Sequence, residues 1–165
     1  SISETESPDN VVMVLNQYFD LIVKEIIAQG GLIDKFIGDC VMAVFKGEFH
    51  LDRAIEASLA IRNHIEALPQ AASKIEFHPK VSIGINSGEM ISGNIGSKTL
   101  KRLDYTVIGD TVNTAQRLQS LAQNGQILIN EEAFDKVKQS FNCKLLGSKT
   151  LKNKSIEVIV YEVLN

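Results

Sequence analysis

The sequence has little of what would indicate several common classes of protein. Two cysteines, Cys40 and Cys143, stand far apart, which argues against a disulfide framework and a cysteine metal site. No apolar run approaches the roughly 20 residues of a membrane span, and the opening S-I-S-E-T-E-S-P is too polar for a signal peptide. A net charge of −3 gives no general attraction to nucleic acid or anionic membrane. We therefore expect a cytoplasmic location, with no nucleic-acid partner and no direct membrane insertion.

The three histidines, His50, His64 and His78, also lack metal-ligand spacing, and we interpret them as surface or capping residues. A length of 165 residues, 44% hydrophobic and 22% charged, is typical of one soluble globular domain. The chain does not begin with Met, and its first helical pattern starts almost at once. We expect a single domain over residues 1–165 that comes from a longer protein.

Two short apolar runs, Leu32–Ile37 and Cys40–Phe45, flank Gly38-Asp39, a pattern that predicts a β-hairpin with a carboxylate at its tip. The simplest interpretation of Asp39 is the second residue of a type I′ turn, chosen for backbone reasons. Lys35 likewise reads as a surface lysine of a strand. The functional interpretation of both residues depends on motifs later in the chain.

Apolar spacing and turn residues predict the remaining elements. Glycines at 93 and 96 inside one expected strand indicate a bulge or a close backbone approach. A twisted edge ribbon is the simplest interpretation, and room for a partner or ligand is the functional alternative. The first expected helix starts at Pro8 and ends at Gly30, and the other expected helices cover Leu51–Leu68, 110–122 and Glu131–Val137. The expected strands cover Lys80–Asn86, Met90–Ile95, Asp104–Gly109, Gln126–Asn130, Lys144–Leu151 and Ile156–Leu164.

Helices that alternate with strand pairs in this way favour an α/β fold of the α+β sandwich type. We expect a ferredoxin-like, mainly antiparallel sheet with helices packed on it. No internal repeat is visible.

A few polar residues lie where a core-building sequence has little use for them. Asn113 and Arg117 stand four apart on an expected helix, and so share a face. Arginine and lysine beside a carboxylate that can bind metal are the groups that phosphoryl transfer uses. Lys152 and Lys154 in the last turn could contact phosphate, or could simply be solvated turn lysines.

Three stretches carry a specific resemblance. G-G-L-I-D-K-F-I-G-D-C-V-M-A-V-F, G-I-N-S-G-E-M-I-S-G-N-I-G-S and D-Y-T-V-I-G-D-T-V-N-T-A-Q-R-L occur in the order and spacing of the catalytic domain of class III nucleotidyl cyclases. The chain resembles this family from about Ser7 to its C-terminus. The resemblance implies a cyclase fold and a head-to-tail homodimer with two active sites at its interface. It also implies an adenylate cyclase, a lyase that converts ATP to 3′,5′-cyclic AMP and pyrophosphate in signal transduction.

The resemblance also implies residue roles. Asp39 matches the second of two metal-binding aspartates, with two Mg²⁺ or Mn²⁺ ions per site. Asn113 matches the residue that orients the ribose, and Arg117 the one that stabilises charge on the α-phosphate. Lys152 matches the lysine that grips the terminal phosphates, although Asn153 replaces a glycine common in that loop. Each site would combine Asp39 of one protomer with the other site residues of its partner.

Lys35 and Thr106 match the pair that reads the base. A lysine donates to the ring nitrogen of adenine, where guanine presents an N–H, so Lys35 favours ATP. Thr106 stands where many adenylyl cyclases have aspartate, and its hydroxyl can donate or accept. The family's first metal aspartate lies in an F-x-D-I-x-G-F-T strand that the sequence does not contain, so we expect a catalytic domain without its first strand. A second departure is Glu89, where some members have an arginine.

Two other functions stay open at this point. A guanylyl cyclase is the nearest enzymatic alternative. A non-catalytic dimerisation or regulatory module would explain the absent first aspartate, but not the retention of Lys35, Asp39, Asn113 and Arg117. Regulatory domains are expected elsewhere in the full-length chain.

Overall fold

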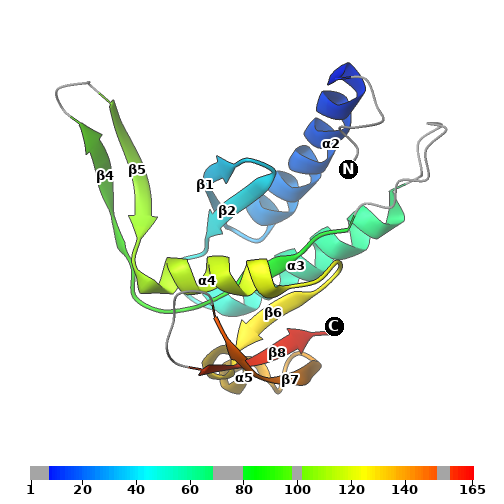
Figure 1. The fold of residues 1–165 in the computed structure, drawn as a ribbon, viewed down its shortest axis with the longest axis vertical. Coiled ribbons are helices and arrows are strands. Elements are labelled where there is room, and N and C mark those ends of the chain that lie inside the picture. The colour runs from blue at the N-terminus through cyan, green and yellow to red at the C-terminus, as the bar shows by residue number, and fades with distance from the viewer. Residues whose placement is uncertain (1–7, 69–79, 98–101, 152–156) are drawn as a thin grey trace. The chain divides into compact units, whose positions relative to one another are not determined.

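A computed structural model describes residues 8–68, 80–97, 102–151 and 157–165 (Figure 1). The chain forms two compact units, Ser1–Val81 (unit 1) and Ser82–Asn165 (unit 2). The single domain expected over residues 1–165 stays a prediction.

The described residues of unit 1 form two helices and a hairpin. Helix α2 spans Pro8–Ala28, strands β1 and β2 span Leu32–Ile37 and Cys40–Val44, and helix α3 spans His50–Ala67. These bounds lie within a few residues of the sequence prediction, because apolar spacing and the glycines at 30 and 31 mark them clearly.

Unit 1 is held together by contacts among its helices and the hairpin. Ile26 of α2 is 5% exposed and Ile55 of α3 is fully buried, so each helix buries an apolar face. Phe19 of α2 meets Phe36 of β1 edge-to-face, with ring centroids 5.3 Å apart. Helix α2 therefore supports one face of the hairpin.

Arg53 of α3 also stabilises unit 1 through hydrogen bonds to backbone carbonyl groups. Its Nε donates to the carbonyl of Glu48 at 3.0 Å, its Nη1 donates to the carbonyl of Gln29 at 3.0 Å, and its Nη2 donates to the carbonyl of Lys46. These oxygens belong to the C-terminal end of α2 and to the loop after β2, where carbonyl groups lack partners within their own elements. The guanidinium also lies 6.0 Å from the ring centroid of Phe45.

The described residues of unit 2 form a four-stranded sheet, a two-stranded ribbon and two helices (Figure 1). Its elements are β3 Ile83–Ile85, β4 Ile91–Ser97, β5 Arg102–Ile108, α4 Asp110–Leu121, β6 Ile127–Asn130, α5 Glu131–Val137, β7 Cys143–Thr150 and β8 Glu157–Val163. The order of helices and strands matches the sequence prediction throughout the described residues.

The four-stranded sheet has the order β3-β6-β8-β7, with a parallel β3–β6 pair and antiparallel pairs elsewhere. Helix α4 packs on this sheet, since Leu118 joins Leu128, Leu151 and Val160 in one buried cluster. Strand β3 lies close to α4 at Gly84, where a Cβ would come within 2.4 Å of the Ala115 carbonyl oxygen. Glycine is the residue that permits this approach.

The β4–β5 ribbon corrects one prediction. Its antiparallel register runs without a shift from Ile91 opposite Ile108 to Ser97 opposite Arg102. A Cβ at Gly93 would meet nothing within 4 Å. The expectation of a bulge or a close backbone approach at this glycine is therefore wrong, and the two strands pair in regular register.

Candidate active site

The hairpin of unit 1 presents Asp39 at its tip, as predicted. Ile37 pairs with Cys40, so Gly38 and Asp39 form a two-residue turn. Gly38 has φ of +59°, whereas Phe49 is the one non-glycine residue with a positive φ in the described part of the chain. The expected type I′ turn is therefore wrong, because it needs a positive φ at both positions; a glycine alone at the first position is the pattern of type II′.

Asp39 is exposed, and its Oδ1 accepts a weak hydrogen bond from the Cys40 thiol at 3.7 Å. Partial burial of the thiol, then the negative charge of Asp39 and this hydrogen bond, raise the pKa of Cys40. The thiol therefore favours its protonated form beside the carboxylate.

The carboxylate of Asp39 suits Mg²⁺ or Mn²⁺, which prefer oxygen ligands. The described residues contain no group of three or more side chains that could hold a metal ion by themselves. Magnesium is commonly bound by one or two carboxylates together with substrate phosphates, so an exposed Asp39 fits that arrangement.

Lys35 lies on β1, four residues before Asp39. Successive side chains of a strand point to opposite faces, and Phe36 packs against Phe19 of helix α2. Lys35 is therefore directed to the face away from α2. Its side chain is 41% exposed, and its Nζ lies 3.6 Å from Oδ2 of Asp34.

Helix α4 of unit 2 carries the other described site residues. Asn113 is exposed and Arg117 is half-buried, while Thr114 and Leu118 are buried on the packed face of the helix. The backbone N–H of Asn113 donates to the carbonyl of Gly109 at 3.1 Å, which closes the first helical turn. Among the described residues, no hydrogen bond or ion pair engages the side chains of Asn113 and Arg117, so both are available to a substrate.

A network of side-chain hydrogen bonds organises the start of α4. Asn86 Nδ2 donates to the carbonyl of Thr111 at 3.1 Å, and Asn130 Nδ2 donates to Asn86 Oδ1 at 2.9 Å. Thr111 Oγ1 donates to the carbonyl of Glu89 at 2.7 Å. The segment before β4 is thereby tied to the helix that carries Asn113.

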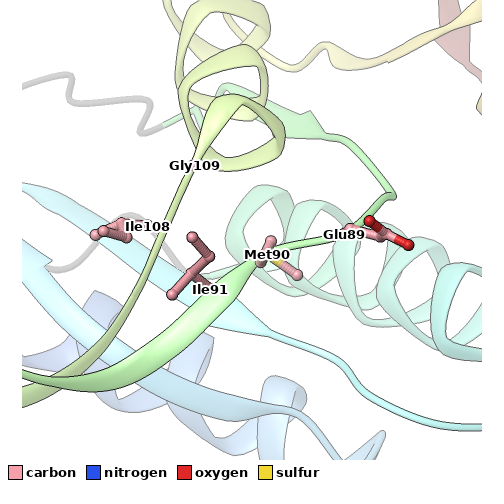
Figure 2. Close-up of a pocket in the computed structure, with 5 residues that line it drawn as sticks. All are labelled: Glu89, Met90, Ile91, Ile108 and Gly109. Atoms are coloured by element: carbon pink, nitrogen blue, oxygen red, sulfur yellow. The ribbon is translucent and has the colours of Figure 1, made fainter.

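An open hollow of about 250 Å³ lies beside this segment, lined by Glu89, Met90, Ile91, Ile108 and Gly109. Figure 2 shows Ile91 and Ile108 projecting from neighbouring strands near the start of α4. None of the predicted site residues lines it, apart from Glu89, which the sequence singled out only as a departure.

The remaining predicted site residues lie partly outside what the structure describes. The backbone of Thr106 belongs to β5, opposite Gly93, but its side chain is outside the described part. Lys152, Lys154 and His78 lie outside the described residues altogether. Lys35 and Asp39 belong to unit 1, while Thr106, Asn113 and Arg117 belong to unit 2. That these residues form one site stays a prediction.

No pattern in the sequence predicts a role for Asp34 or Arg53. Asp34 and Lys35 are consecutive charged residues of one expected strand, and a regular strand places such neighbours on opposite faces. Nothing in the sequence distinguished Arg53 from other helix-surface arginines. Of the histidines, His64 lies on the surface and pairs with Glu25 at 2.8 Å, and His50 Nδ1 lies 3.2 Å from the Gly47 carbonyl oxygen at the start of α3.

Comparison with known proteins identifies the family. Residues 1–164 match the family described as adenylate and guanylate cyclase catalytic domain. Adenylate cyclase 1 of Rhizobium meliloti is 34% identical over 173 residues, which cover 99% of this chain and 25% of that protein. The chain thus spans about a quarter of that relative's length.

Two solved structures are similar over nearly the whole chain. The adenylyl cyclase CyaB from P. aeruginosa has a TM-score of 0.90 at 35% identity, covering 99% of this chain and 87% of that one. The guanylate cyclase domain of RhGC from Catenaria anguillulae, in complex with GTP, has a TM-score of 0.86 at 26% identity, covering 99% and 88%. These similarities confirm the predicted fold class. In the described part of the chain, no helix is long and apolar enough to span a membrane.

Proposed function

Because the chain belongs to the adenylate and guanylate cyclase catalytic domain family, we propose that it converts ATP to 3′,5′-cyclic AMP and pyrophosphate. The observation that carries this proposal is the pair Asn113 and Arg117, which share a face of α4 with no competing partner among the described residues. Lys35 on β1 can only donate hydrogen bonds, and this supports a preference for ATP over GTP as the substrate.

The reaction is an intramolecular displacement. The ribose 3′-oxygen attacks the α-phosphorus, the bond between that phosphorus and the oxygen bridging to the β-phosphate breaks, and pyrophosphate leaves. The proton of the 3′-hydroxyl passes to solvent. Negative charge builds on the oxygens around the α-phosphorus, and a positioned guanidinium stabilises it.

Each site residue has a separate role in this reaction. Arg117 stabilises the charge on the α-phosphate, and Asn113 holds the ribose so that its 3′-oxygen is in line. Lys152 binds the terminal phosphates. Lys35 and Thr106 read the base, with Lys35 donating to the adenine ring nitrogen.

Asp39 would hold a divalent metal ion together with the substrate phosphates. When bound, Mg²⁺ or Mn²⁺ at such a site lowers the pKa of the attacking hydroxyl and neutralises phosphate charge. We propose a homodimer in which Asp39 of one protomer serves the site formed by the other residues of its partner. Regulatory domains elsewhere in the protein and a cytoplasmic location stay predictions.

The test is a cyclase assay on the full-length protein with ATP or GTP, in Mg²⁺ and then in Mn²⁺. Cyclic AMP that depends on metal supports the proposal. Arg117→Ala should lower turnover by on the order of 10²-fold or more with little effect on folding, because it removes a charge partner of the transition state. Arg62→Ala on α3 is the matched control, and should stay close to wild type.

Guanylyl cyclase activity is the second candidate, because the domain of RhGC that binds GTP has a TM-score of 0.86 to this chain. Formation of cyclic GMP from GTP in excess over cyclic AMP from ATP, at equal substrate concentrations, would favour it. Nucleotide binding without turnover in either metal would instead indicate a non-catalytic module.

A further inference from the structure

Strand β1 contains a β-bulge at an acidic residue next to Lys35. Ile33 pairs with Ala43 and Lys35 pairs with Met42, so Asp34 is the extra residue of the ribbon. In a regular strand, Asp34 and Lys35 would point to opposite faces. A bulge redirects a side chain locally, and here it allows the two to meet.

The pair is asymmetric in its exposure. Asp34 Oδ2 lies 3.6 Å from Lys35 Nζ, and the side chain of Asp34 is only 7% exposed while that of Lys35 is 41% exposed. Asp34 also has an interaction besides this one. A largely buried carboxylate therefore lies beside a lysine whose side chain remains accessible to a ligand.

This arrangement bears on how a lysine can select a base. Adenine presents a bare ring nitrogen where guanine presents an N–H, so a donor at that point favours adenine only if it is held there. An unrestrained lysine has high rotamer freedom, and its ammonium can move away from a mismatched base at little cost. A carboxylate that limits where Nζ lies reduces that freedom before the nucleotide arrives.

We propose that Asp34 is a positioning residue for Lys35: it holds the lysine ammonium at the purine edge and so sets the preference for ATP over GTP. The proposal rests on the proposed function, and adds a residue from outside the base-reading pair. Asp34 does not touch the reacting atoms, so its effect should fall on base selection and not on the chemical step.

The test compares Asp34→Asn with wild type in the full-length protein, with kcat and KM measured for ATP and for GTP. We expect the ratio of kcat/KM for ATP to that for GTP to fall about 3- to 10-fold, mainly through a higher KM for ATP. Asp34→Glu keeps the charge and should recover part of the ratio. Asp20→Asn is the control for the charge change itself, since it breaks an exposed pair with Lys24 on α2, and it should leave the ratio unchanged.

A double-mutant cycle separates positioning from a structural role. In a Lys35→Ala background, Asp34→Asn should change the ratio by less than about 2-fold, because there is no lysine left to position. If Asp34→Asn lowers stability or overall activity but leaves the wild-type ratio intact, the proposal is wrong, and Asp34 only supports the hairpin.

Failure of the positioning role of Asp34 can be distinguished from failure of the proposed cyclase activity. If the wild-type protein forms no cyclic nucleotide, the proposed function is wrong, and the same variants are then compared by their affinities for fluorescent ATP and GTP analogues. A wild-type preference for the ATP analogue that Asp34→Asn reduces still supports the positioning role. An unchanged affinity ratio, or a wild-type protein that binds neither analogue, overturns it.

Discussion

Replacing Gly84 with alanine tests how closely strand β3 packs on helix α4. An added Cβ would lie 2.2 Å from the backbone nitrogen of Gln119 and 2.4 Å from the carbonyl oxygen of Ala115. Ordinary van der Waals contact begins near 3.4 Å, so strand and helix would have to separate by roughly 1 Å. Both obstacles are main-chain atoms, so no change of side-chain rotamer can relieve them.

Overpacking of a core usually costs about 1–3 kcal/mol. Because this clash is with the backbone, we expect Gly84→Ala to lie at the upper end and to lower the free energy of unfolding by about 3 kcal/mol. For a chain of this size, that corresponds to a fall in Tm of about 6–12 °C. Helix α4 carries Asn113 and Arg117, so its displacement should also lower turnover.

The assay is urea and thermal unfolding of the purified protein, followed by circular dichroism. Gly93→Ala is the matched control, because a Cβ there meets nothing within 4 Å. It should leave the free energy of unfolding unchanged or raise it by up to about 1 kcal/mol. A Gly84→Ala protein within about 0.5 kcal/mol of wild type would refute the close packing of β3 on α4.

Three further predictions concern other parts of the chain. Arg53→Met removes hydrogen bonds to three backbone carbonyls and should lower the free energy of unfolding of the protein by about 2–4 kcal/mol in urea, whereas Arg117→Met should change it by less than about 0.5 kcal/mol. Lys35→Glu exchanges a donor for an acceptor and should lower the kcat/KM ratio of ATP to GTP by on the order of 10-fold or more; an unmoved ratio would mean that the base is read elsewhere. Burial raises the pKa of the thiols of Cys40 and Cys143, so both should react with iodoacetamide more slowly than a free thiol at around pH 8, as followed by mass spectrometry. Raised folded-state pKa values also mean that these thiols favour the folded state below their ordinary pKa, and lose that contribution as the pH rises through the folded value.

The elements of this protein were predictable because local spacing decides them. The bounds of α5 were predicted to the residue, since Asn130 caps the helix by accepting from the N–H of Ala133 at 3.0 Å, and apolar residues then recur at helical spacing. The hairpin was predicted from Gly38-Asp39, but its turn type was not. A glycine next to an aspartate suits either primed turn, and the backbone angle at the aspartate depends on how the two strands twist.

The site divides in the same way. The identity and spacing of Lys35, Asp39, Asn113 and Arg117 are in the sequence, and with them the resemblance to nucleotidyl cyclases. The sequence does not show which polar side chains already form hydrogen bonds within the fold. Arg53 and Arg117 both lie on amphipathic helices, yet the structure assigns hydrogen bonds to the first and none, among the described residues, to the second.

The sequence alone therefore determined the order of helices and strands, because this depends on neighbours within a few positions along the chain, and it contained the three motifs that predict the family and the candidate residues. Only the tertiary structure decided that a bulge brings Asp34 to Lys35, that Gly84 lies against the backbone of α4, and that Arg53 binds carbonyls beyond its own helix. These contacts join residues whose meeting depends on strand register and on packing between elements, which no local pattern of residues specifies.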